Sequence, residues 1–302
     1  MKRRIIAVLS AAALTFTIGI AAAPAASADG HLGASYVALG DSMASGNGNL
    51  PYVDPVCLQS ARSYPKLLAA ATGRDLVSAA CTAATTDQVA MQLGQLQLDG
   101  DIGPGTELVT LTAGINDLGW QQALAVCAAP GMEAQCALAV QAMAAAGATV
   151  PGKIYGLLMG IRAAAPNAVI VVTGYPKLFG TVTKSCSIGN LGGSSVKLPA
   201  SLTVMANGAL DGAVDDPFPP GSDPMPGLND AIAGATWLFA STDPVGTLFV
   251  DVDPAFQTHR LCDTGDRWIS GLIRGVPVDR GLHPNAAGLQ AFAATIGAAL
   301  VP

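Results

Sequence analysis

Five short apolar segments, separated by alanine- and leucine-rich stretches long enough to form helices, run through this chain of 302 residues. The segments are Tyr36–Leu39, Asp75–Ala79, Leu108–Thr112, Ala168–Thr173 and Thr247–Val252. Short continuous apolar runs are typical of strands that are buried on both faces. Strands that alternate with helices need crossover connections, which make neighbouring strands parallel. We therefore predict an α/β fold with a central five-stranded parallel sheet covered by helices on both faces.

The stretches between these segments predict the covering helices. Tyr64–Thr72 and Ile154–Ala165 have helical length and composition, and we expect a last helix from Pro284 to Leu300, with the proline near its first turn. Ser194–Pro226 is rich in Gly, Pro, Ser and Asp, which favours a surface excursion; a mobile lid is the less favoured alternative. There is no internal repeat.

The first 28 residues have the features of a secretory signal peptide. Cations occupy positions 2–4, an apolar run covers 5–23, and the small residues Ala26-Ser27-Ala28 form a cleavage site. A membrane span is the alternative, and the cleavage site together with the alanine-rich character of the run argues against it. We expect residues 29–302 to be exported as one extracellular domain.

The charge of the exported chain limits its partners. Removing the three cations of the signal peptide from the net charge of −6 leaves −9. Lys and Arg do not cluster, so we expect neither nucleic acid nor an anionic membrane surface as a partner. No later segment is long and apolar enough to span a bilayer, so we expect no stable membrane insertion. We expect a monomer.

Six cysteines lie after the signal peptide, at positions 57, 81, 127, 136, 186 and 262. An even number in an exported protein predicts three disulfides, and six cysteines allow 15 pairings. We favour the sequential pairing Cys57–Cys81, Cys127–Cys136 and Cys186–Cys262, because each bridge then closes a separate loop region. No Cys-x-x-Cys spacing is present, which disfavours zinc, and we expect no metal.

A candidate nucleophile follows the first predicted strand. Ser42 lies in the glycine-rich turn Gly40–Gly48, and α/β enzymes place nucleophilic serines in such turns. The small turn 81–84 follows the second strand, Gly114–Asp117 follows the third, and His283 lies beyond the fifth. Because ligands bind at the carboxyl ends of parallel strands, we expect these four segments to meet at one edge of the sheet.

A serine hydroxyl needs a base within hydrogen-bond reach. The chain has three histidines. His31 lies near the N-terminus, and His259, three residues before Cys262, is better explained as structural. His283 lies in a loop that enters a helix, where the helix dipole opposes the charged imidazolium and favours a neutral, proton-accepting ring. By elimination and position, His283 is the predicted base.

Acyl transfer also needs hydrogen-bond donors for the developing oxyanion. The candidates are the backbone N–H groups of Ser42 and Ala83 and the side-chain amide of Asn116. An Asx-type turn is the alternative role for Asn116. Trp120, four residues further on, is a candidate wall for an acyl pocket, and a core or surface role is equally open.

These motifs together resemble the SGNH hydrolase superfamily, the GDSL lipases and esterases, and in particular its secreted actinobacterial, Streptomyces-type lipase branch. The matching blocks are Gly40-Asp41-Ser42, Gly114-Ile115-Asn116-Asp117 and Gly281-Leu282-His283-Pro284-Asn285. Further matches are Gly174-Tyr175-Pro176, and His259 and Cys262 ahead of Trp268.

The resemblance implies a three-layer α/β/α flavodoxin-like fold. It implies Ser42 as nucleophile, Asn116 as an oxyanion donor and His283 as general base. It also implies disulfides that pair sequentially and a catalytic domain that covers residues 29–302.

Two departures from the family pattern affect the predicted site. Ala83 stands where the second block normally has Gly, which keeps the N–H but restricts the backbone. Arg280 stands three residues before His283, where Asp is common, and the acid is Asp279. Either Asp279 orients the imidazole, or a main-chain carbonyl of Arg280 or Gly281 does. We favour a carbonyl, because a shift of one residue redirects the side chain.

The predicted activity is hydrolysis of carboxylic esters of acyl lipids through an acyl-enzyme, without a metal or organic cofactor. A carbohydrate O-deacetylase or an acyltransferase on the same fold is the alternative among enzymes. A secreted binding module without turnover is the alternative from another class.

Overall fold

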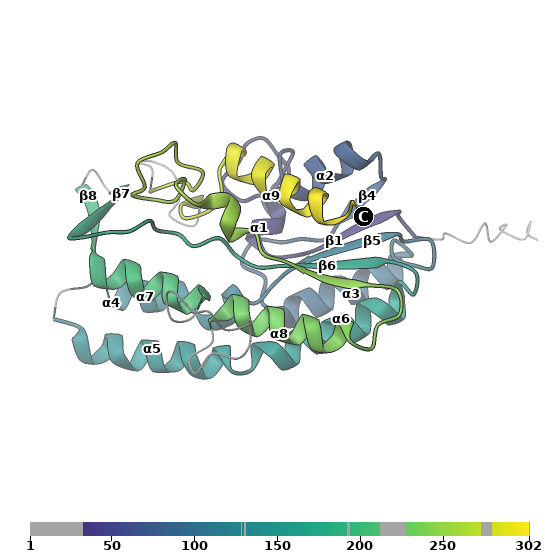
Figure 1. Cartoon of the computed structure of the whole chain (residues 1–302), viewed down its shortest axis with the longest axis horizontal. Helices are drawn as coiled ribbons and strands as arrows, with labels where there is room; N and C mark the ends of the chain where they lie inside the picture. The colour runs from purple at the N-terminus through teal and green to yellow at the C-terminus, as the bar shows by residue number, and fades with distance from the viewer. Residues whose placement is uncertain are drawn as a thin grey trace, which may run out of the picture. The chain divides into compact units, whose positions relative to one another are not determined.

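A five-stranded parallel sheet forms the centre of the computed structural model (Figure 1). Its strands are β1 (Tyr36–Gly40), β4 (Leu76–Ser78), β5 (Leu108–Thr112), β6 (Val169–Thr173) and β9 (Thr247–Val250). They lie in the order β4-β1-β5-β6-β9, and every neighbouring pair is parallel. This is the flavodoxin-like order, in which the chain reverses its direction of travel between the first and third strands, β1 and β5. A ligand site is therefore expected beyond the carboxyl ends of these two strands.

The structure describes residues 33–301 except 128, 130, 192–193, 212–226 and 273–279. The predicted signal peptide, His31 and Asp279 lie outside the described residues. Residues Leu32–Pro302 form one compact unit. Among the described residues, no helix has the length and apolar character needed to cross a membrane.

Helices cover both faces of the sheet, as the sequence predicts. α2 (Tyr64–Thr72) and α9 (Ala286–Ala299) pack together on one face. α3 (Thr86–Asp99), α6 (Val150–Ala164) and α8 (Leu228–Ala240) lie side by side on the other (Figure 1). The α/β prediction, with a parallel five-stranded sheet between two helical layers, is confirmed.

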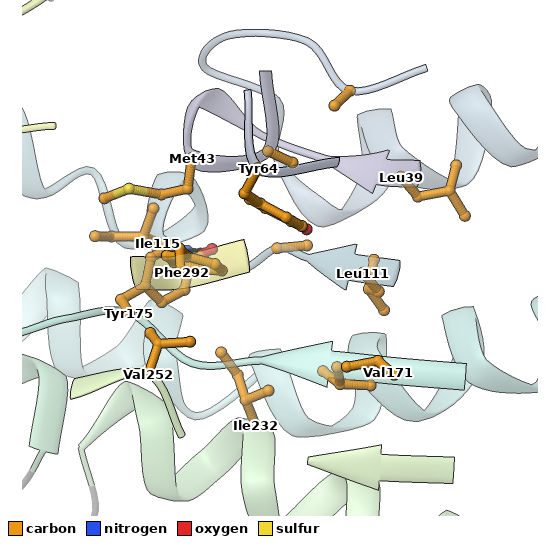
Figure 2. Packing of buried hydrophobic residues seen from close by; sticks show 14 of the residues in the cluster. Leu39, Met43, Tyr64, Leu111, Ile115, Val171, Tyr175, Ile232, Val252 and Phe292 are labelled. Atoms are coloured by element: carbon orange, nitrogen blue, oxygen red, sulfur yellow. Dashed lines mark hydrogen bonds between the residues drawn. The ribbon is translucent and has the colours of Figure 1, made fainter. Parts of the chain in front are cut away.

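Apolar side chains from both layers fill the space around the strands (Figure 2). Leu39, Leu111 and Val171 come from three neighbouring strands and are fully buried. Tyr64 of α2 stacks on Phe292 of α9, with 4.6 Å between ring centroids. This packing fixes the strand ends from which the candidate site projects.

The remaining elements lie in the connections. They are α1 (Ser42–Ser45), β2 (Tyr52–Asp54), β3 (Gln59–Ser60), η1 (Ile115–Leu118), α4 (Trp120–Cys127), α5 (Glu133–Gly147), β7 (Ser185–Leu191), β8 (Ser194–Pro199), α7 (Ala200–Asp211) and η2 (Asp253–Phe256). β2 pairs with β3, and β7 with β8, in two antiparallel hairpins.

Two local predictions differ in detail from the structure. The stretch Ser194–Pro226, expected as a surface excursion, forms a strand and a helix up to Asp211, and residues 212–226 lie outside the described residues. β8 pairs with β7 and buries Leu198, and this tertiary pairing outweighs the loop-like composition. The last helix begins after Asn285 and not at Pro284, because the Asn285 side chain caps the helix by accepting from two backbone N–H groups.

Three disulfides connect the six cysteines. Their pairs are Cys57–Cys81, Cys127–Cys136 and Cys186–Cys262, which is the sequential pairing. The first joins the β2–β3 hairpin to the turn after β4. The second links α4 to α5, and the third links β7 to the segment after η2.

Candidate active site

The turn after β1 presents Ser42 at the switch point of the sheet. The strand ends at Gly40, and Asp41 caps the short helix α1 by accepting a hydrogen bond from the Met43 N–H at 2.9 Å. The Asp41 N–H donates to the Thr112 carbonyl of β5 at 3.0 Å. Gly40 has φ +150°, and a Cβ there would lie 2.5 Å from that same carbonyl oxygen, so only glycine fits. The sequence Gly-Asp-Ser therefore suits this tight exit from the strand.

His283 lies against Ser42. Its Nε2 is 2.7 Å from the Ser42 Oγ, and the two side chains are 7% and 6% exposed. Its Nδ1 is 2.8 Å from the Gly281 carbonyl oxygen. Because a carbonyl oxygen only accepts, Nδ1 carries the proton and the lone pair of Nε2 faces the serine hydroxyl. This is the tautomer that a general base needs.

Backbone hydrogen bonds hold the His283 loop on two sides. The Leu282 N–H donates to the Ser270 carbonyl, and the Ser270 N–H donates to the His283 carbonyl, both at 2.8 Å. From the Ser42 side, the buried Asn49 donates through Nδ2 to the Pro284 carbonyl at 2.8 Å. Although they lie far apart in the sequence, the serine and histidine loops are thus connected directly.

Two candidate oxyanion donors are backbone N–H groups near Ser42. Within the described residues, neither the Ser42 N–H nor the Ala83 N–H donates to any acceptor. Ala83 has φ +61°, in the left-handed region that glycine adopts most easily. The alanine therefore preserves the backbone conformation that a glycine would take, at a cost of roughly 1–2 kcal/mol.

Asn116 contributes the third candidate donor from η1, directly after β5. Its Nδ2 donates to the Ala84 carbonyl at 3.0 Å, and this bond uses one of the two amide hydrogens. On the other side of the same turn, the Cys81 N–H donates to the Gly40 carbonyl at 3.0 Å. Hydrogen bonds therefore join the turn 81–84 to both the serine strand and the Asn116 segment.

A buried carboxyl group lies next to the serine. Asp41 is fully buried, and its Oδ2 accepts a hydrogen bond from the Tyr175 hydroxyl at 2.6 Å. The Tyr175 oxygen in turn accepts from the Ile115 N–H at 3.3 Å. Burial raises the pKa of Asp41 to about 7, and the Tyr175 hydrogen bond opposes this rise. This chain of hydrogen bonds connects the turn after β1 to the segment that holds Asn116.

The other histidine among the described residues has surroundings typical of a structural residue. The His259 ring stacks on Trp268 with 3.7 Å between centroids, and its Nδ1 is 2.7 Å from the Asp266 carbonyl oxygen. Within the described ranges, no group of three or more His, Cys, Asp or Glu side chains could hold a metal ion.

Four residues of the site region were not assigned a role from the sequence, and Asp41 is the first of them. Tyr175 and Asn49 make the bonds given above, and the Gln92 side chain of α3 bonds both the N–H and the carbonyl of Gly40. Tyr175 had a usable signal, since it lies two residues after the fourth predicted strand and so at the same sheet edge. Asn49 and Gln92 had none, because their partners are set by tertiary packing.

Comparisons with known proteins agree with this geometry. The model of the GDSL-like lipase/acylhydrolase family matches residues 38–291. The chain is 32% identical to a lipase from Streptomyces rimosus over 286 residues, covering 92% of each protein.

Two solved structures have the same fold. The extracellular lipase of Streptomyces rimosus matches with a TM-score of 0.66 and 29% identity, over 87% of this chain and 98% of that one. Phospholipase A1 from Streptomyces albidoflavus NA297 matches with a TM-score of 0.67 and 27% identity, over 88% and 99%. The chain therefore belongs to the GDSL-like lipase/acylhydrolase family.

Proposed function

We propose that this protein hydrolyses carboxylic esters of acyl lipids through an acyl-enzyme on Ser42, with His283 as the general base. The chain is an ester hydrolase of the GDSL family, and its relatives are lipases and a phospholipase. A carbohydrate deacetylase, an acyltransferase and a binding module without turnover are therefore not favoured. The observation that carries the proposal is the 2.7 Å contact between Ser42 Oγ and His283 Nε2.

In the proposed reaction, Ser42 Oγ attacks the ester carbonyl as its proton passes to His283 Nε2. The oxyanion accepts hydrogen bonds from the Ser42 and Ala83 N–H groups and the second amide hydrogen of Asn116. His283 then protonates the leaving alcohol, and the acyl-enzyme forms. A water molecule, deprotonated by His283, releases the acid and restores the serine.

The Gly281 carbonyl is proposed to orient His283, in place of an aspartate. The support is the 2.8 Å contact of that carbonyl with Nδ1. Asp279→Asn should then lower kcat by less than about tenfold. Neutralising the aspartate of a Ser-His-Asp triad costs about 10⁴. A loss of that size would instead assign the orienting role to Asp279.

An apolar cavity supports a long acyl chain as part of the substrate. The cavity has a volume of about 740 Å³ and lies between η1, α4 and α5 on one side and α7 and α8 on the other. Ile115, the residue before Asn116, lines it, together with Trp120, Met143, Met205 and Leu228. Each buried methylene contributes about 0.8 kcal/mol, so longer acyl groups should bind better.

Export is part of the proposal. Residues 1–28 act as the signal peptide, and the catalytic domain 29–302 works outside the cell as a monomer. The support is the composition of the N-terminal segment, the three disulfides and the extracellular lipase among the similar structures.

The test is hydrolysis of p-nitrophenyl esters from acetyl to palmitoyl by residues 29–302. Ser42→Ala and His283→Ala should each lower kcat by at least about 10³. His259→Ala and Ser241→Ala, which change the same residue types outside the site, should stay within about threefold of the unmodified protein.

Rates that peak at octanoyl or longer would support the acyl cavity, whereas a maximum at acetyl would favour the deacetylase. Activity that survives both site changes would contradict the mechanism.

A further inference from the structure

The segment from Leu50 to the end of β3 at Ser60 exposes only apolar residues to solvent. Between residues 50 and 60, the exposed residues are Leu50, Pro51, Val53, Pro55 and Val56. Leu50, Val53 and Val56 are 61%, 57% and 83% exposed. Single exposed aliphatic residues are normal on a protein surface, but a group of them on one short segment marks a contact surface. We call residues 50–60 the apolar hairpin.

The apolar hairpin has little charge. Its one ionisable acid is Asp54, whose Oδ1 accepts hydrogen bonds from the Val56 and Cys57 N–H groups at 2.8 and 3.2 Å. Residues 50–60 contain no Lys or Arg, and one exposed cation, Arg62, follows them. The exported chain carries −9 once the three signal cations are removed. This surface therefore suits an uncharged apolar phase better than an anionic one.

The connection between β2 and β3 in the apolar hairpin is fastened to the turn that holds Ala83. The Cys57–Cys81 disulfide crosses this boundary, and the Thr82 N–H donates to the Cys57 carbonyl at 3.1 Å. Val56, the most exposed aliphatic residue of the hairpin, is thus next in sequence to a cysteine bonded to the candidate oxyanion turn.

The N-terminal end of the apolar hairpin is fastened to the His283 loop. Asn49, directly before the hairpin, donates to the Pro284 carbonyl at 2.8 Å. The Arg280 guanidinium lies over the Tyr52 ring, 5.3 Å from its centroid. The apolar hairpin is therefore a fixed rim that joins two loops of the candidate active site.

We propose that the apolar hairpin docks the protein on the surface of aggregated, uncharged ester lipid, with Leu50, Val53 and Val56 entering the apolar phase. The inference rests on the proposed function, because the docked phase is the substrate itself. A water-insoluble ester must leave its aggregate to reach Ser42, and side chains that enter the aggregate beside the site shorten that transfer. The two attachments, at Asn49 and Cys57, keep these side chains exposed without a cost in loop ordering on docking.

One ester in two physical states tests this inference. Tributyrin is assayed below its solubility limit, where it is dissolved, and above it, where droplets form. The double variant Val53→Ser/Val56→Ser should hydrolyse dissolved tributyrin within twofold of the unmodified protein and lose at least fivefold on droplets. Leu98→Ser is the matched control, because Leu98 is also 83% exposed but lies in the last turn of α3. The Asp101 carbonyl, three residues later, accepts from the Ala34 N–H before β1, at the opposite end of that strand from Ser42. The control should lose nothing on either form.

Equal losses on both forms would overturn the inference and make the hairpin part of the site's structure. Unchanged rates on both forms would overturn it as well. A second measurement separates this inference from the proposed function. Ser42→Ala, with and without the two valine changes, is floated with triolein droplets, and the valine changes should reduce bound protein at least fivefold. If the unmodified protein hydrolysed no ester while flotation still depended on the two valines, the proposed function alone would be contradicted.

Discussion

Asp41 is the residue on which the geometry of the serine turn depends most. One carboxylate oxygen caps α1, and the other accepts from Tyr175, which lies 134 residues away in the sequence. The group is fully buried, and burial raises its pKa to about 7 from an ordinary value near 3.8. A carboxyl group whose pKa is raised by folding binds its proton more tightly in the folded protein than in the unfolded chain.

The pH dependence of stability follows from this raised pKa. Below pH 3.8 Asp41 is protonated in both states, and between pH 3.8 and about 7 the folded state holds the proton that the unfolded chain releases. Stability from this group is therefore lost as the pH rises through that window. Asp41→Asn does not titrate, so its free energy of unfolding relative to the unmodified protein should increase by about 2–3 kcal/mol between pH 5 and pH 8. Urea unfolding at both pH values measures this, and a constant difference would contradict the raised pKa.

At this scale, the sequence supported some inferences better than others. Ser42, Asn116 and His283 could be selected because each follows a predicted strand or precedes the last helix. The link from Asp41 through Tyr175 to Ile115 could not be predicted, because it depends on how three strand ends are spaced in the folded sheet. Nor could the φ of +61° at Ala83, since alanine seldom adopts it.

Among the elements, α9 has the closest connection to the candidate base. It begins at Ala286, three residues after His283, and packs against α2. The Asn285 Oδ1 accepts from the Ala287 and Gly288 N–H groups, and its Nδ2 donates to the Arg267 carbonyl at 2.6 Å. One side chain thus caps the helix and holds the segment that precedes it.

Removing this cap should lower the stability of the folded protein. Asn285→Ala should lower the free energy of unfolding by about 1–2 kcal/mol, because it loses an N-cap and leaves a carbonyl without its donor. Gln290→Ala on the exposed face of the same helix is the control and should stay within about 0.5 kcal/mol. Denaturant unfolding measures both, and equal effects would show that the cap has no special role.

The elements of the central sheet were easier to predict than those of the connections. All five strands formed close to their expected positions, because apolar runs of four to six residues between turn signals are too short for a helix and suit a strand. β8 and α7 were missed, because the composition of 194–211 resembles a loop until β7 supplies a pairing partner. Local composition does not report such a partner.

At the scale of the whole molecule, the order of the strands brings the candidate site together. β1 and β5 are neighbours, so Ser42 and Asn116 emerge side by side at the switch point, and α9 returns His283 to the same edge. Alternating strands and helices predicted a parallel sheet, but the strand order came only from the resemblance to the family. The apolar hairpin, the cavity and the disulfides are then additions to a fold that already defines the site.

The most direct test of the central claim is labelling by a fluorophosphonate, which reacts only with an activated serine. Incubation of residues 29–302 with the probe, followed by peptide mass spectrometry, should give one modified peptide with the label on Ser42. His283→Ala should slow labelling by at least about 10² because the hydroxyl loses its base, and His259→Ala should label at the unmodified rate. An unlabelled Ser42 in the folded protein, or labelling that does not depend on His283, would contradict the account.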